Sequence, residues 1–416
     1  GRGRGGGGVG GGGGGWGGGG GGIRGRAAAA NDAGEVLRSG AFPQMVLALH
    51  ESDVAQHPHP QASWTVLLLY YQLTVRYSKI LSSGPAHLVP KVMEAICGSQ
   101  GLGNPNPMLC SRSCYFLTKL VKALKEDAVN YVSVIVPGVQ DMISSKGNAS
   151  NTLSSEAILN LAETVGYLIG LENVPDPQKV MYLDSVLSEQ FSKVSAILQQ
   201  VSASGVPSTP MGIRDQHLAG TELAASVGTM ASISKGFKSI VGPELEARFF
   251  KALEAATSAL LVFQGHTSLR AKTIFLIHGL IPCLGEGVLR GLPQAALLTL
   301  VGAGDGKDIM EVVQLLNQLT IEFGPKAASL LDGVLLPFIK RTFELMPSTS
   351  NGATSGVGEA GSGVSKQRGT LEAAEKGSSA LPEAGIPTGE QAVLGGGGGP
   401  AGVAPGQLLA HEVVER

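Results

Sequence analysis

Apolar residues recur at intervals of three and four along nearly all of residues 63–346, and this pattern restricts the possible fold more than any other feature. Such stripes lie on one face of an α-helix. A clear example consists of Phe116, Leu117, Leu120, Val121 and Leu124. The alternation of β-branched and polar residues that half-buried strands require is absent from the sequence. We therefore expect an all-α protein.

Gly and Pro residues interrupt the helical pattern about every 15–25 residues. The interruptions divide residues 63–346 into about twelve helices, which pair into units of roughly 40–50 residues. That period fits HEAT or armadillo repeats better than the shorter tetratricopeptide repeat. One pair cannot bury its apolar face alone, so pairs must stack on one another. The sequence predicts a HEAT-type solenoid, an α-α superhelix of about six helical hairpins. The alternative, a four-helix bundle with appendages, is disfavoured by the large number of similar helices.

Glycine is concentrated outside this helical region. Nineteen of the first 26 residues are Gly, and the segment after about Pro347 is rich in Gly, Ser and Ala. Neither segment has enough apolar surface to offset the entropy lost on ordering. We expect a disordered arm at 1–30, a solenoid at 31–347 and a disordered tail at 348–416.

Two interpretations of the arm remain open. Its Arg and Gly residues would suit RNA binding through charge and stacking, whereas the alternative is a repeat in a Gly-rich coding sequence or a wrongly predicted exon. The first residue is Gly, not Met, and no signal-peptide pattern follows it. We therefore expect this chain to be a fragment of a longer protein.

Charge and cysteine content exclude several classes of protein. The chain has 31 basic and 33 acidic residues, which argues against a uniformly basic nucleic-acid binder. Four cysteines are too few and too scattered for a disulfide scaffold and fit a reducing compartment, the cytosol or nucleus. No apolar run reaches the roughly 20 residues of a membrane span, so no membrane insertion is expected.

Motifs of enzymes and metal sites are incomplete. A Gly-rich segment resembles a phosphate-binding loop, but Val301 and Asp308 stand where Gly and Ser or Thr are needed. Cys110 and Cys114 are one helical turn apart without a second ligand pair at zinc spacing, so we expect them to pack in the core. His57-Pro58-His59 has no acidic or Cys partner nearby. The sequence predicts no catalytic residue, no metal site and no cofactor, and the protein is not expected to be an enzyme.

A local excess of positive charge indicates a binding surface instead. Residues 95–125 contain Arg112, Lys119, Lys122 and Lys125 but no acidic residue. Arg112 and Lys119 are two helical turns apart on nearly the same face, and the two lysines that follow step around the helix. Such a series of cations suits a polyanion, although a solvated helix face is the alternative. Arg270 and Lys272, at the start of another helix, form a second, weaker candidate.

Several motifs carry a resemblance to a known family. The His-Pro turn within residues 51–60 leads into a helix containing Val75-Arg76-Tyr77. Further motifs follow in order, at residues 111–124, Glu163-Thr-Val-Gly166, Leu269-Arg270 through His278, Lys307-Asp308 through Leu319, and Pro337-Phe338 through Glu344. Together they resemble the tRNA exportins (the exportin-T family) of the karyopherin-β superfamily over most of residues 45–346.

The resemblance implies a nuclear export receptor for tRNA. Members of that family are HEAT superhelices that bind tRNA cooperatively with the GTP form of the Ran GTPase, pass nuclear pores by contacting pore proteins, and shuttle between nucleus and cytoplasm. Their solenoid is longer than this one, so this chain resembles a central fragment in which most of the Ran surface is missing. Carried over to this sequence, the tRNA contacts would be first Arg112 and Lys119, then Lys122 and Lys125. Arg270 and Lys272 are added as the weaker candidates from the charge pattern.

Two other functions remain open. A karyopherin-β that carries protein cargo would have the same repeats, although the Val-Arg-Tyr motif and the motif at 111–124 favour the tRNA branch. A HEAT scaffold without a transport role would bind neither tRNA nor Ran.

Overall fold

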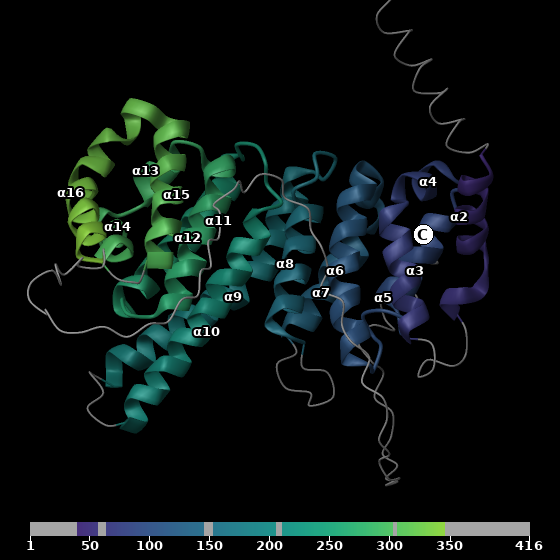
Figure 1. Ribbon diagram of the computed structural model, residues 1–416, viewed down its shortest axis with the longest axis horizontal. Coiled ribbons are helices and arrows are strands. Elements are labelled where there is room, and N and C mark those ends of the chain that lie inside the picture. Colours follow the sequence, from purple (N-terminus) through teal and green to yellow (C-terminus); the bar gives the residue numbers. More distant parts are fainter. Residues whose placement is uncertain (1–39, 57–63, 145–152, 205–209, 303–305, 346–416) are drawn as a thin grey trace, which may run out of the picture. The chain divides into compact units, whose positions relative to one another are not determined.

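The computed structural model describes residues 40–56, 64–144, 153–204, 210–302 and 306–345, which belong to one compact unit (Figure 1). Among these residues there are helices and no strands. The all-α prediction is thus confirmed. The arm expected at 1–30, the tail expected at 348–416 and the His57-Pro58-His59 turn lie outside the described residues.

The helices follow one another with short connections. In chain order they are α2 (Ala41–Glu51), the 3-10 helix η1 (Asp53–Gln56), α3 (Trp64–Arg76), α4 (Ser78–Ser83), α5 (Leu88–Cys97), α6 (Pro107–Leu124), the 3-10 helix η2 (Lys125–Tyr131), α7 (Val132–Ser144), α8 (Ser155–Ile169), α9 (Asp176–Ser204), α10 (Pro210–Ser234), α11 (Pro243–Val262), α12 (Thr267–Leu284), α13 (Gly287–Gly291), α14 (Gln294–Gly302), α15 (Gly306–Phe323), the 3-10 helix η3 (Gly324–Ala327) and α16 (Ala328–Leu345).

The helices pack in two rows. Row A contains α7, α9, α11, α14 and α16, and row B contains α3, α6, α8, α10, α12 and α15; each helix contacts the next one in its own row. Consecutive helices also pack across the rows, as in the pairs α7/α8, α9/α10, α11/α12 and α14/α15. Before them, α5 packs against α6 and α2 against α4. This pattern of neighbours is that of a helical-hairpin solenoid, with about as many hairpins as the sequence predicts.

Polar contacts between row neighbours show the repeat length directly. Five hydrogen bonds or ion pairs between helices of successive hairpins join residues 38 to 46 positions apart, at Arg270–Asp308, His278–Gln318, Lys122–Glu163, Gln140–Ser185 and Thr118–Thr164. Two others span 64 and 72 positions, at Arg248–Asp184 and Lys235–Glu163. The unit of roughly 40–50 residues expected from the breakers therefore agrees with the fold.

Breaker residues mark several helix boundaries as expected. Asn106 caps α6, because its side chain accepts hydrogen bonds from the backbone N–H groups of Met108 (3.0 Å) and Leu109 (3.3 Å). Pro243 opens α11 at its first turn. The region 63–346 holds fourteen described α-helices in place of about twelve, because a break at Tyr77 separates α3 from α4 and the five-residue α13 forms a helix of its own.

The core runs between the two rows. Cys110 and Cys114 are buried free thiols, so the expectation that they pack in the core is confirmed. Row B is particularly tight where α8 meets α10. A Cβ atom added to Gly166 would lie 2.0 Å from the carbonyl oxygen of Ile233, so only Gly fits there.

Candidate nucleic-acid interface

Helix α6 presents basic side chains on the side opposite its buried stripe. Leu109, Leu117 and Leu120 are fully buried, whereas Arg112 and Lys119 are exposed. The ammonium of Lys119 lies 5.3 Å from the ring centroid of Tyr115, one turn earlier. Arg112 makes no ion pair with any described residue. These two cations are therefore available to a ligand.

Lys125 and Lys122 have different environments at the end of the same helix. Lys125 is exposed at the C-cap position of α6, where its φ of 52° is unusual for a non-Gly residue. Lys122 is partly buried and ion-paired with Glu163 of α8. Its charge is thus partly compensated within the protein.

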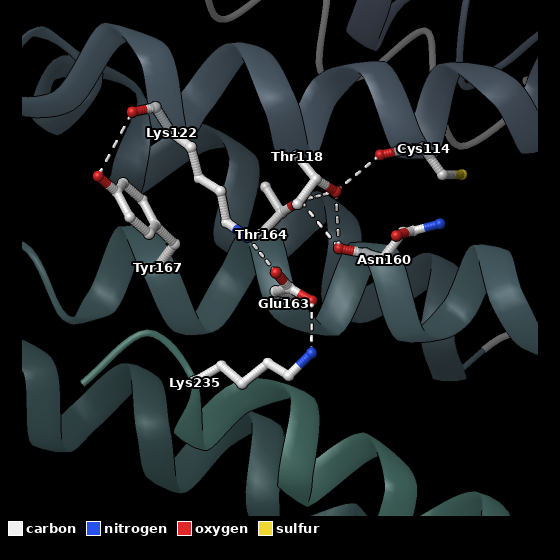
Figure 2. Close-up of polar contacts among 8 residues, drawn as sticks. All are labelled: Cys114, Thr118, Lys122, Asn160, Glu163, Thr164, Tyr167 and Lys235. Atoms are coloured by element: carbon white, nitrogen blue, oxygen red, sulfur yellow. Dashed lines mark hydrogen bonds and ion pairs between the residues drawn. The ribbon is translucent and has the colours of Figure 1, made fainter. Parts of the chain in front are cut away.

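Glu163 lies between two lysines from different parts of row B, as Figure 2 shows. One carboxylate oxygen, Oε1, accepts a hydrogen bond from Lys122, and the other, Oε2, lies 3.3 Å from the ammonium of Lys235, which directly follows α10. Burial raises the pKa of Glu163, but hydrogen bonding to Lys122 and the charge of Lys235 outweigh this effect, so its pKa is lowered. The carboxylate is therefore ionised at neutral pH, and the three residues carry a net charge of about +1.

Hydroxyl groups join α6 and α8 beneath this ion pair (Figure 2). The hydroxyls of Thr118 and Thr164 are 2.8 Å apart, and each lies 3.0 Å from the carbonyl oxygen of Asn160. One turn further, the Tyr167 hydroxyl lies 3.5 Å from the carbonyl oxygen of Lys122. The backbone beneath Lys122 and Glu163 is therefore held without the help of the two charged groups.

Three lysines on or next to row-B helices, one of them Lys235, also lie beside aromatic rings. The ammonium of Lys235 lies 4.2 Å from the ring centroid of Phe275 on α12, and the ammonium of Lys272 lies 5.9 Å from the same centroid. The ammonium of Lys238 lies 5.5 Å from the ring centroid of Tyr167. Lys235 and Lys238 were not among the residues predicted from the sequence, because they follow α10 in a short connection. Phe275, which lies within a motif of the family resemblance, was the one signal in the sequence that could have pointed to Lys235.

We call the row-B surface the set formed by Arg112, Lys119, Lys122, Lys235, Lys238 and Lys272 with the rings of Tyr115, Tyr167 and Phe275. The pairwise contacts just described connect most of these residues across α6, α8, α10 and α12.

The balance of charged residues differs between the two rows. The helices of row B carry eight basic and seven acidic residues, whereas those of row A carry six basic and nine acidic. Acidic residues are thus in excess on row A, while the two signs are nearly balanced on row B.

Arg270 does not belong to this surface. Its side chain is 2% exposed and forms an ion pair with Asp308 of α15. The guanidinium is therefore not available to a phosphate, and we leave Arg270 out of the interface. The pair instead connects α12 to α15.

The residues that carry the family resemblance mostly link helices of row B. Glu163 bonds to Lys122 of α6, Gly166 allows α10 to approach α8, Arg270 pairs with Asp308, and His278 is hydrogen-bonded to Gln318 of α15. These motifs therefore specify how one repeat packs on the next.

Other kinds of site find no support in the described part of the chain. Its residues contain no group of three or more His, Cys, Asp or Glu side chains placed to hold a metal ion. None of its helices combines the length and the apolar character needed to cross a bilayer.

Comparison with known proteins assigns the fold to a family. The model of a family described as Exportin-T matches residues 24–358. Proteins named Exportin-T are similar to this chain in Arabidopsis thaliana (26% identical over 317 residues), Homo sapiens (24% over 323) and Aspergillus niger (27% over 333). These alignments cover 74–76% of this chain and 31–32% of each relative. The chain thus spans about a third of the length of the curated relatives it matches.

Proposed function

The chain belongs to the Exportin-T family, and on this basis we propose that it is part of a nuclear export receptor for tRNA. The observation that carries the proposal is the row-B surface, a set of cations, most of them lysines beside aromatic rings, in a protein whose overall charge is close to neutral. Folded RNA is recognised mainly through phosphates, 2′-hydroxyls and shape. A series of fixed cations along successive repeats suits that kind of ligand.

Arg112 and Lys119 are the first contacts that we propose for phosphates, because both are exposed and neither is neutralised by a described acid. Lys272 of the row-B surface and Lys125, exposed at the end of α6, are further proposed contacts. Lys122 is proposed to contribute only in part, since Glu163 already binds its ammonium. We also include Lys235 and Lys238 among the proposed contacts, because their ammonium groups lie beside the rings of Phe275 and Tyr167.

The remaining parts of the proposal concern the whole receptor. The complete protein would bind tRNA cooperatively with Ran-GTP, contact nuclear pore proteins and shuttle between nucleus and cytoplasm, acting as a transport receptor and not as an enzyme. Cooperativity suits a stacked array, since one ligand can order repeats that a second ligand also needs in order.

Charge reversal on α6 tests the proposed surface. We expect the double variant Arg112→Glu, Lys119→Glu to bind tRNA at least about tenfold more weakly, with a salt dependence shallower by about two phosphate contacts. Fluorescence anisotropy of labelled tRNA over a range of salt measures both quantities, and circular dichroism checks helicity.

The matched control reverses two exposed lysines of row A, Lys251→Glu and Lys340→Glu, and should change tRNA affinity much less. Equal effects in both double variants would show that only net charge matters. Unchanged affinity in the α6 variant would remove Arg112 and Lys119 from the tRNA surface.

A further inference from the structure

We propose that Glu163 determines specificity on the row-B surface: by holding Lys122 and Lys235 in place and neutralising part of their charge, it favours a folded RNA over a flexible one. The proposal rests on the proposed function, because it assumes that this surface binds RNA.

The position of Glu163 supports this role. Its carboxylate is the one acidic group that contacts the described cations of this surface, and it contacts two of them, from α6 and from the end of α10. Its side chain is 18% exposed, and those of Lys122 and Lys235 are 36% and 38% exposed. The ammonium groups therefore remain at the surface while their positions are restricted. The ring of Phe275, with its centroid 4.2 Å from the ammonium of Lys235, restricts this lysine further.

Fixed cations and free cations select different ligands. A lysine that is already held in one position loses little side-chain entropy when a phosphate arrives at that position. A folded RNA has phosphates at fixed positions and benefits from this preorganisation. A linear RNA adapts its phosphates to mobile lysines, so its binding follows mainly the number of uncompensated cations.

Packing alone does not account for Glu163. The hydroxyls of Thr118 and Thr164 and the ring of Tyr167 already connect α6 and α8, and Gly166 brings α8 against α10. A partly exposed ion pair adds little stability. The charge of Glu163 among cations of a binding surface is thus better explained by its effect on a ligand.

The test replaces Glu163 by its neutral isostere in the full 416-residue chain, so that the Arg residues near the N-terminus contribute equally to every variant. Glu163→Gln raises the local charge by one and frees at least one lysine. We expect it to bind a linear single-stranded RNA about three- to tenfold more tightly, with a salt slope steeper by about 0.7. The affinity for folded tRNA should change less, so the preference for tRNA should fall.

Two control variants separate local from general effects. Asp184→Asn removes the same charge from row A and also breaks an ion pair between neighbouring helices, with Arg248 of α11; it should leave the preference for tRNA unchanged. The double variant Glu163→Gln, Lys235→Gln restores the local charge and should return the salt slope for linear RNA to the wild-type value. Thermal unfolding of each variant confirms that it is folded.

Each outcome decides between the proposals. Unchanged salt slope and unchanged preference in Glu163→Gln, with wild-type protein still preferring tRNA, would overturn the role of Glu163 and leave the proposed function intact. The same loss of preference in Asp184→Asn would also overturn it. A wild-type protein without any preference for tRNA would contradict the proposed function and this inference together.

Discussion

His50 shows how the fold determines the behaviour of a single titratable side chain. It is completely buried on α2, with its Nδ1 atom 3.1 Å from the Tyr70 hydroxyl of α3, and its Nε2 atom has no partner among the described residues. Burial, followed by the positive charge of Lys91, lowers the pKa of His50 from 6.5 to about 4. The folded protein therefore contains neutral His50 at pH 5, whereas the unfolded chain is protonated.

This difference predicts a pH dependence of stability. Because the pKa in the folded state lies below the unfolded value of 6.5, the stabilising contribution is complete above pH 6.5 and is lost as the pH falls from 6.5 towards 4. We expect His50→Asn to remove about 2 kcal/mol of the loss in unfolding free energy that wild-type protein shows between pH 7 and pH 5. Urea unfolding at the two pH values measures it. His87→Asn, at an exposed position, is the control, and an identical pH dependence of wild type and His50→Asn would contradict the prediction.

Arg270 and Lys272 show what sequence reasoning reaches at this scale and what it misses. Both lie near the start of α12 and were predicted together as candidate RNA contacts. In the fold Arg270 is 2% exposed beside Asp308, whereas Lys272 is partly exposed beside Phe275. The partner of Arg270 lies 38 residues later, and periodicity within one helix carries no information about a side chain on another repeat. Glu163 went unrecognised as a partner of Lys122 for the same reason.

At the scale of elements, the joint between α8 and α10 depends on small residues. Gly166 of α8 approaches the backbone of Ile233, and Gly236, after α10, lies so close that an added Cβ would be 1.9 Å from the carbonyl oxygen of Gly166. A neighbouring backbone cannot move aside as a flexible side chain can. The helices therefore have to separate if a side chain is added here.

We expect Gly166→Ala to lower the free energy of unfolding by about 1–3 kcal/mol or more, despite the better helix propensity of Ala. Gly242→Ala is the matched control, because no atom lies within 4 Å of its added Cβ and its φ of −67° suits any residue. Chemical unfolding monitored by circular dichroism compares the two. Equal stability of the two variants would show that α8 and α10 do not depend on this close approach.

Helix positions were the part of the structure that the sequence predicted best. Breakers such as Asn106-Pro107 and Gly242-Pro243 coincide with the starts of α6 and α11, because capping and the fixed φ of Pro act locally. The break between α3 and α4 was not foreseen. Tyr77, where the two helices separate, is not a breaker residue, and its backbone conformation depends on packing.

At the scale of the molecule, two rows of stacked helices form the described structure. The repeat period could be predicted because it appears in the sequence as the spacing of breakers. The family resemblance could be recognised from motif residues along the sequence, and in the fold several of these residues join successive repeats. The row-B surface could be predicted only where its cations are close in sequence, on α6. Lys235 and Lys238 reach it through the stacking of α10 beside α8 and α12.

The central claim is that this surface belongs to a receptor for folded tRNA. Its most direct test is fluorescence anisotropy of labelled tRNA against the full chain over a range of salt, with a linear single-stranded RNA of equal length as competitor. We expect tighter binding of tRNA than of the linear RNA and a steep decrease of affinity with salt. Equal affinity for the two RNAs, or binding of neither, would contradict the account.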